Sequence, residues 1–163
     1  MLVSGAVLGT LLGVLIGRSW QPLFEAAEIK LFPVLIGSLL LRLVAPLAAG
    51  LAYFLYVVAL GLTVIAAGAN FRLAGAMLVA AGGALNLGVA LANGGMPVDP
   101  AAVATAGARM PSDALHVPLT SSSAFGAFAD VIPVALVHNV YSAGDFAIAA
   151  GGFLVPFMLL SRR

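Results

Sequence analysis

Residues 43–70 read LVAPLAAGLAYFLYVVALGLTVIAAGAN, and residues 73–98 read LAGAMLVAAGGALNLGVALANGGMPV. Neither stretch contains a charged residue, and each is longer than the roughly 20 apolar residues that cross a bilayer as a helix. Only Phe71 and Arg72 separate the two stretches. Such a short connection predicts an antiparallel pair of membrane-spanning helices.

The composition of the whole chain is typical of a membrane protein. Of its 163 residues, 63% are hydrophobic and 8% are charged, whereas soluble domains have about 45–50% and about 25%. The net charge of +1 gives no electrostatic basis for binding nucleic acid. The chain has no cysteine, which excludes disulfides, thiolate nucleophiles and cysteine-based metal sites. We expect one transmembrane domain over residues 1–163.

Shorter apolar runs flank the central pair and extend the pattern. We predict an all-α membrane protein with about five transmembrane helices and a structured extracytoplasmic loop. The predicted spans are residues 2–17, 29–45, 47–69, 72–93 and 143–161. Residues 94–142 form the predicted outward loop, with short helices, one of which begins at Asp99-Pro100 and ends at Gly107. Residues 18–30, which include Trp20, suit a short helix lying at the membrane interface.

The distribution of positive charge predicts the orientation of these spans, because cytoplasmic loops carry an excess of lysine and arginine. Five basic residues fall on one side and two on the other. The first group is Arg18, Lys30, Arg72, Arg162 and Arg163, and the second is Arg42 and Arg109. We therefore expect a multi-pass protein of the cytoplasmic membrane, with a cytoplasmic C-terminus and an outward-facing 94–142 segment.

Small residues crowd the two central helices and allow close approach of backbones. They are Gly61, Ala66, Ala67, Gly68, Gly75, Ala80, Ala81, Gly82, Gly83 and Ala84. We expect these helices to contact the lipid bilayer and to offer surfaces for membrane protein partners. No charge lies at the centre of a predicted helix, which argues against a proton pump or ion transporter.

Two aspartates, Asp130 and Asp145, lie among apolar residues near the predicted outer membrane edge. Ser142 and Asp145 have the spacing of a capping box at the start of the last helix, and spacing alone favours that structural role. Asp130 has no comparable role. Alternatively, two aspartates that share one proton can activate water for peptide hydrolysis, provided the chain folds back to bring them together.

Three polar residues are candidates for orienting a substrate or a carboxylate in such a site: Asn93, His138 and Asn139. His138 and Asn139 are equally compatible with a position at the membrane interface. His116 could extend the site, but its spacing from His138 does not match a metal-binding motif. We expect neither a metal nor a cofactor.

Three motifs carry a resemblance over most of the chain: NGGMP at residues 93–97, FADVI at 128–132 and YSAGD at 141–145, with Gly151 following. The chain resembles an uncharacterised family of small bacterial membrane proteins, known as a domain of unknown function. The resemblance implies the cytoplasmic (inner) membrane of a bacterium and implies no activity.

A second, local resemblance is to lipoprotein signal peptidase, an intramembrane aspartic protease. That family has an Asn-x-Gly motif, a Val-Asp-Phe aspartate and an Asn-x-Ala-Asp aspartate that opens its last helix. NGG at residues 93–95, ADV at 129–131 and SAGD at 142–145 are similar to these motifs. The resemblance implies that Asp130 and Asp145 are catalytic at the outer membrane face.

Two functions therefore remain open. The first, slightly favoured by the sequence, is a non-catalytic subunit or scaffold of a membrane complex. The second is an intramembrane aspartic peptidase-like enzyme that uses Asp130 and Asp145. A lipid or quinone site between the helices is a third option that no residue pattern selects.

Overall fold

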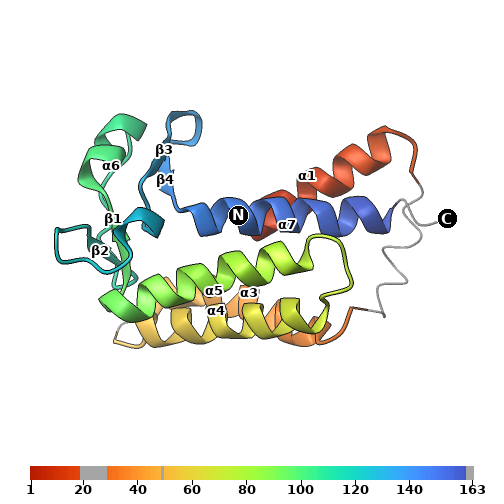
Figure 1. Cartoon of the computed structure of the whole chain (residues 1–163), viewed down its shortest axis with the longest axis horizontal. Coiled ribbons are helices and arrows are strands. Elements are labelled where there is room, and N and C mark those ends of the chain that lie inside the picture. The colour runs from red at the N-terminus through yellow and green to blue at the C-terminus, as the bar shows by residue number, and fades with distance from the viewer. Residues whose placement is uncertain (19–28, 49, 161–163) are drawn as a thin grey trace.

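The computed structural model describes residues 1–18, 29–48 and 50–160, which are mostly helical (Figure 1). Apolar helices occur at each of the predicted positions, with slightly different ends. They are α1 (Leu2–Leu15), α3 (Phe32–Val44), α4 (Ala52–Ala69), α5 (Ala76–Asn93) and α7 (Ala143–Leu159). α3 continues into a 3-10 turn, η2 (Ala45–Leu47). The predicted interfacial helix around Trp20 lies outside the described residues.

Two of these helices, α4 and α5, are long and apolar enough to cross a membrane. α1, α3 and α7 are apolar but have only 14, 13 and 17 residues. At about 1.5 Å per residue, α1 covers only about 21 Å along its axis, against a hydrocarbon core of about 30 Å. The prediction of five transmembrane helices is therefore supported for two and not for the other three.

α7 is the centre of the helical part, because it packs against both α1 and α5. α5 also packs on α4, and α4 packs on α3, so the order across the molecule is α1, α7, α5, α4, α3. Gly5 and Gly9 of α1 lie directly against the backbone of Ala149 and Phe153 in α7. Gly82 of α5 lies against the Gly144 carbonyl in the same way. Several small residues thus serve contacts within the chain.

The 94–142 segment gathers at one end of the helices (Figure 1) and contains strands that the all-α prediction missed. β1 (Met96–Val98) pairs in parallel with β2 (His116–Pro118), and β3 (Ile132–Val134) pairs antiparallel with β4 (Asn139–Tyr141). Each strand has three residues, too few to show the alternation by which a strand is recognised.

Short helical turns complete this segment. α6 (Pro100–Ala106) begins after Asp99, whose side chain accepts a hydrogen bond from the Ala101 N–H, and ends at Gly107 with φ +63°. The prediction of this helix and of its two ends is confirmed. Two 3-10 turns follow, η3 (Gly126–Phe128) and η4 (Ala135–Val137). A small apolar core joins α6 to β1 and β4; its members are Val98, Ala102, Val103, Ala106 and Val140.

Candidate functional site

β1 positions two polar side chains, one from each of its neighbours. On one side, Met96 is paired with His116 of β2. On the other side, Val98 forms a parallel bridge with Asp130, whose N–H donates to the Pro97 carbonyl at 2.9 Å. Residues two apart in a strand face the same way, and directly paired residues share a face. The side chains of His116 and Asp130 therefore lie on the same face as Met96 and Val98.

The carboxyl group of Asp130 is buried, with only 7% of the residue exposed. Its Oδ1 atom has no hydrogen-bond partner among the described residues. Burial, together with the negative charge of Asp145, raises the pKa of Asp130 to about 8. Because the charged form is the one that burial disfavours, Asp130 holds its proton at neutral pH.

Asp145 has a different environment at the start of α7. The Ser142 Oγ accepts from the Asp145 N–H at 3.0 Å, and the Ser142 N–H donates to the Asp145 Oδ2 at 3.3 Å. The predicted capping box is therefore confirmed. The Asn86 side chain of α5 donates to the Asp145 Oδ1 at 3.2 Å and accepts from the Ser142 Oγ at 3.0 Å. Both carboxylate oxygens of Asp145 are thus hydrogen-bonded.

Gly144 makes room for this arrangement. A side chain at Gly144 would collide with the Asn86 side-chain amide and with the Gly82 carbonyl. Asn86 itself is 1% exposed, so its amide must find hydrogen-bond partners within the protein. Ser142 and Asp145 supply them, and this fixes the first turn of α7 against α5.

Asp130 and Asp145 line the same two neighbouring cavities, with volumes of about 250 and 150 Å³. The two cavities share four lining residues: Arg42, His116, Asp130 and Asp145. The smaller cavity is also lined by Tyr56, Asn86, Met96 and Leu115. The larger cavity is also lined by Met1, Val98, Val103, Ala108, Arg109, Pro111, Asp113, Asn139, Val140 and Tyr141. The chain thus folds back so that both aspartates line the same cavities.

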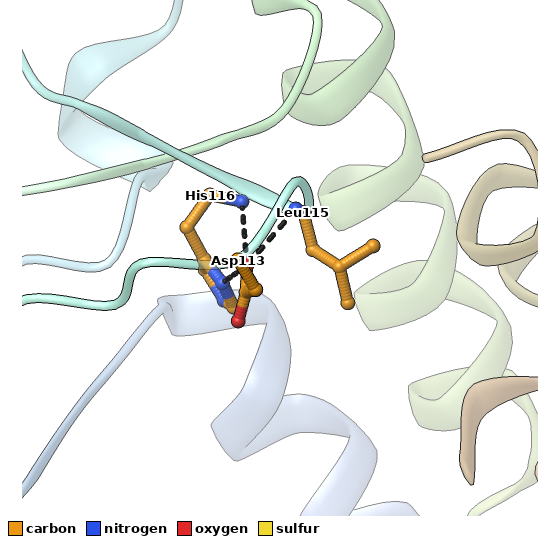
Figure 2. Close-up of polar contacts among 3 residues, drawn as sticks. All are labelled: Asp113, Leu115 and His116. Atoms are coloured by element: carbon orange, nitrogen blue, oxygen red, sulfur yellow. Dashed lines mark hydrogen bonds and ion pairs between the residues drawn. The ribbon is translucent and has the colours of Figure 1, made fainter. Parts of the chain in front are cut away.

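In the lining of the larger cavity, the carboxylate of Asp113 contacts His116 (Figure 2). The Asp113 Oδ1 lies 2.7 Å from the His116 Nδ1 and accepts from the N–H groups of Leu115 and His116 at 2.9 and 3.2 Å. Partial burial acts to raise the pKa of Asp113, but the hydrogen bonds from His116 and Leu115 outweigh it and lower that pKa. Asp113 is therefore an anionic acceptor for the imidazole ring.

The cavity also contains positive charge. Arg42, at the end of α3, lies over the ring of Tyr56 at 5.7 Å from its centroid. Among the described residues, the ion pair within 4.0 Å joins Asp113 and His116. Neither Arg42 nor Arg109 is paired with a carboxylate of the described residues. The described residues contain no group of three histidine or acidic side chains that could hold a metal ion.

The predicted orienting residues do not all reach the aspartates. Asn139 lines the larger cavity, and its Oδ1 accepts from the Val140 N–H at 2.9 Å. Asn93 instead joins the end of α5 to the loop, donating to the carbonyls of Val89 and Ala124 at 2.7 and 3.0 Å. The His138 Nδ1 lies 3.2 Å from the carbonyl of Ala106, the last residue of α6. Neither Asn93 nor His138 lines either cavity.

Sequence reasoning assigned no site role to Asn86 and Asp113, and little weight to His116. A single amide in an otherwise apolar helix is a usable signal for Asn86, because such a group needs a polar partner. For Asp113 and His116, the usable signal is their three-residue spacing, which allows a contact between the two side chains. Their proximity to Asp130 depends on the pairing of β1, which no local pattern reveals.

Comparisons with known proteins identify a family and no activity. The model of a family of unknown function, DUF5317, matches residues 24–157. No curated protein and no solved structure matches the chain. The match covers both aspartates and most of the chain, so the expected membership of a family of unknown function is confirmed, while the resemblance to lipoprotein signal peptidase stays a prediction. The chain belongs to the family of unknown function DUF5317.

Proposed function

We propose that this protein is a membrane-embedded hydrolase that cleaves a peptide bond in a membrane-anchored substrate, with Asp130 and Asp145 as its acid–base pair. The observation that carries the proposal is the environment of Asp130. Its carboxyl group is buried, lacks a partner for Oδ1 among the described residues, and opens into the cavities that Asp145 also lines. A buried carboxyl group that holds its proton, beside a second carboxyl group, is typical of acid–base catalysis.

The proposed reaction assigns a separate role to each aspartate. Asp145 removes a proton from a water molecule, and the water oxygen forms a bond to the carbonyl carbon of the substrate. Asp130 donates its proton to the carbonyl oxygen, which becomes a hydroxyl group in the tetrahedral intermediate. The C–N bond then breaks, and the leaving amine takes the proton that Asp145 had received. The hydroxyl proton returns to Asp130 as the new carboxyl group forms, so water is the only other reactant.

The positive charges at one end of the helices support an outward-facing position for the cavities, which lie at the other end. The Arg18 side chain donates to the Phe157 carbonyl near the end of α7, and the Lys30 N–H donates to the Asn70 side chain at the end of α4. Arg18, Lys30 and Arg72 thus belong to the end opposite the 94–142 segment. By the positive-inside rule that end is cytoplasmic, in the bacterial inner membrane that the family resemblance implies.

The proposed membrane embedding includes all five apolar helices. α1 supports it, because Leu8, Leu11 and Leu15 are 60%, 54% and 81% exposed. Such a surface is costly in water and suited to lipid. α1 and α3 are short for a complete span, so we propose that the bilayer is thinned beside them.

An apolar groove supports the choice of a membrane-anchored substrate. The groove has a volume of about 360 Å³ and is formed by side chains of α1, α3, α4, α5 and α7. It adjoins the polar cavities, since Leu2 lines the groove and Met1 lines the larger cavity. On α3, Leu39 lines the groove and Arg42, one turn further, lines both cavities. An amphipathic substrate fits an apolar groove that lies beside polar cavities.

The test is cleavage of a lipid-anchored peptide in vesicles that contain the purified protein. We expect Asp130→Asn and Asp145→Asn each to lower kcat by at least about 10²-fold without unfolding the protein. Asp99→Asn is the matched control, because asparagine also caps helices and Asp99 lines neither cavity. Cleavage that persists in Asp130→Asn, or is absent from the wild type over a peptide library, contradicts the proposal.

One observation favours the second candidate, a non-catalytic subunit or scaffold. An added side chain at Gly61, Gly68 or Gly88 would meet nothing within 4 Å. These positions on α4 and α5 leave small-residue surface open to a partner helix. The scaffold proposal expects a stoichiometric membrane protein to co-purify with the wild type and to be lost in Gly61→Leu. It also expects cells to tolerate Asp130→Asn.

A further inference from the structure

We propose that His116, oriented by Asp113, is a third proton-transfer residue of this site and carries protons between solvent and the Asp130 carboxyl group. This inference rests on the proposed function, because the proton transfer serves the proposed hydrolysis. The geometry that supports it is independent of the reaction and begins with β1.

β1 holds His116 and Asp130 on its two sides, in the registers Met96 with His116 and Val98 with Asp130. Because Met96 and Val98 are two residues apart, all four side chains share one face of this small sheet. That face forms part of the cavity walls, since Met96 lines the smaller cavity and Val98 the larger one. His116 and Asp130 line both.

Asp113 determines which ring nitrogen of His116 is available to accept a proton. A carboxylate can only accept hydrogen bonds, so the His116 Nδ1, 2.7 Å from the Asp113 Oδ1, carries the hydrogen (Figure 2). In the neutral ring the Nε2 atom is therefore the acceptor. This arrangement leaves the lone pair of Nε2 free to accept a proton.

The difference in exposure gives His116 its role. The His116 side chain is 27% exposed, whereas Asp130 is 7% exposed and its Oδ1 has no partner among the described residues. Because Asp130 is almost fully buried, its proton reaches solvent by way of the cavities that His116 also lines. His116 takes a proton from solvent at Nε2 and releases one to Asp130 through the cavity water between them, and only N–H and O–H bonds change. The other lining residues with a charged or titratable group are Met1, through its α-amino group, and Arg42, Tyr56, Arg109, Asp113, Tyr141 and Asp145.

The first test is chemical rescue. We expect His116→Ala to lower kcat for the lipid-anchored peptide by roughly 10²-fold with little change in KM, and added imidazole to restore at least a tenth of the wild-type rate. His138→Ala is the matched control, because His138 contacts Ala106 and lines neither cavity. Asp113→Asn should lower kcat less than His116→Ala and should not respond to imidazole, because its ring is present but poorly oriented.

The second test does not depend on cleavage. The infrared C=O band of protonated Asp130, identified by its loss in Asp130→Asn, is followed after a rapid change of pH in wild-type vesicles. The proposal expects this band to respond at least tenfold more slowly in His116→Ala and to recover its speed with imidazole. Wild-type speed in His116→Ala overturns the relay, whether or not the protein cleaves peptides. A slowed band without peptide cleavage supports the relay and contradicts the hydrolase.

Discussion

The helical part and the 94–142 segment are held together in different ways. α1, α5 and α7 approach through glycines, so that Gly5, Gly9 and Gly82 lie against backbone of a neighbouring helix. The 94–142 segment packs through side chains, with Val103 and Val140 in a small core beside β1. Backbone contact tolerates no added atom, whereas a side-chain core tolerates changes of similar volume.

The two aspartates belong to different parts of the molecule, Asp145 to the helical part and Asp130 to the 94–142 segment. Asp145 begins α7 and is hydrogen-bonded to Asn86 of α5, so it is part of the helical packing. Asp130 is held by the backbone of β1, and its side chain is left without a partner at Oδ1 among the described residues. The site thus combines a carboxylate fixed by hydrogen bonds with a carboxyl group kept protonated by burial. Substitutions in the helical part and in the 94–142 segment should separate the contributions of the two parts to stability.

The largest expected effect is on the pH dependence of stability, through Asp130. Its pKa is about 8 in the folded protein, against an ordinary value of 3.8 for aspartate. Between about pH 4 and pH 8 the unfolded chain has lost a proton that the folded protein keeps, so raising the pH lowers the free energy of unfolding. The slope is at most about 1.4 kcal/mol per pH unit, and the loss is complete above about pH 8.

The measurement is denaturant unfolding in detergent micelles from pH 4 to pH 9, for the wild type and Asp130→Asn. The difference between the two curves isolates Asp130 from all other groups. Asp99→Asn supplies the comparison with an aspartate of the same segment that lines neither cavity. If wild type and Asp130→Asn remain parallel over this range, the carboxyl group of Asp130 is not held in its neutral form.

An intermediate effect is expected where α5 meets α7. A side chain at Gly82 would collide with the Gly144 carbonyl and lie 2.9 Å from the Ala147 Cβ, whereas one at Gly88 meets nothing within 4 Å. We expect Gly82→Ala to lower the free energy of unfolding by about 1–3 kcal/mol. Gly88→Ala, on the same helix, should leave it unchanged or raise it by up to about 1 kcal/mol. Thermal unfolding in micelles compares them, and equal effects would remove the distinction between the two faces of α5.

The smallest effect is expected at the start of α6. The Asp99 side chain accepts from the Ala101 N–H at 2.9 Å, and losing such a cap costs about 1 kcal/mol. We expect Asp99→Ala to speed hydrogen exchange at Ala101, Ala102 and Val103, with Asp99→Asn close to wild type. The helical part should keep its protection in both variants. Spread of the faster exchange into α5 would show that the two parts do not unfold separately.

The same division explains what the sequence could predict. Apolar runs of helix length predicted the positions of all five longer helices, and local spacing predicted the caps at Asp99 and Ser142. These signals are local, as helices and caps are. The site depends on contacts between distant residues: Asn86 with Asp145, and Val98 with Asp130. Strands of three residues and a single buried amide leave too little pattern to predict such pairings.

The contact between α1 and α7 has a consequence for how the protein is made. These helices pack together although α1 ends at Leu15 and α7 begins at Ala143. At the usual rate of about 5–20 residues per second, a ribosome needs on the order of ten seconds to synthesise the residues between them. Throughout that interval the glycine face of α1 is present without its partner. The glycine face of α1 therefore lacks the helix that covers it until α7 has been synthesised.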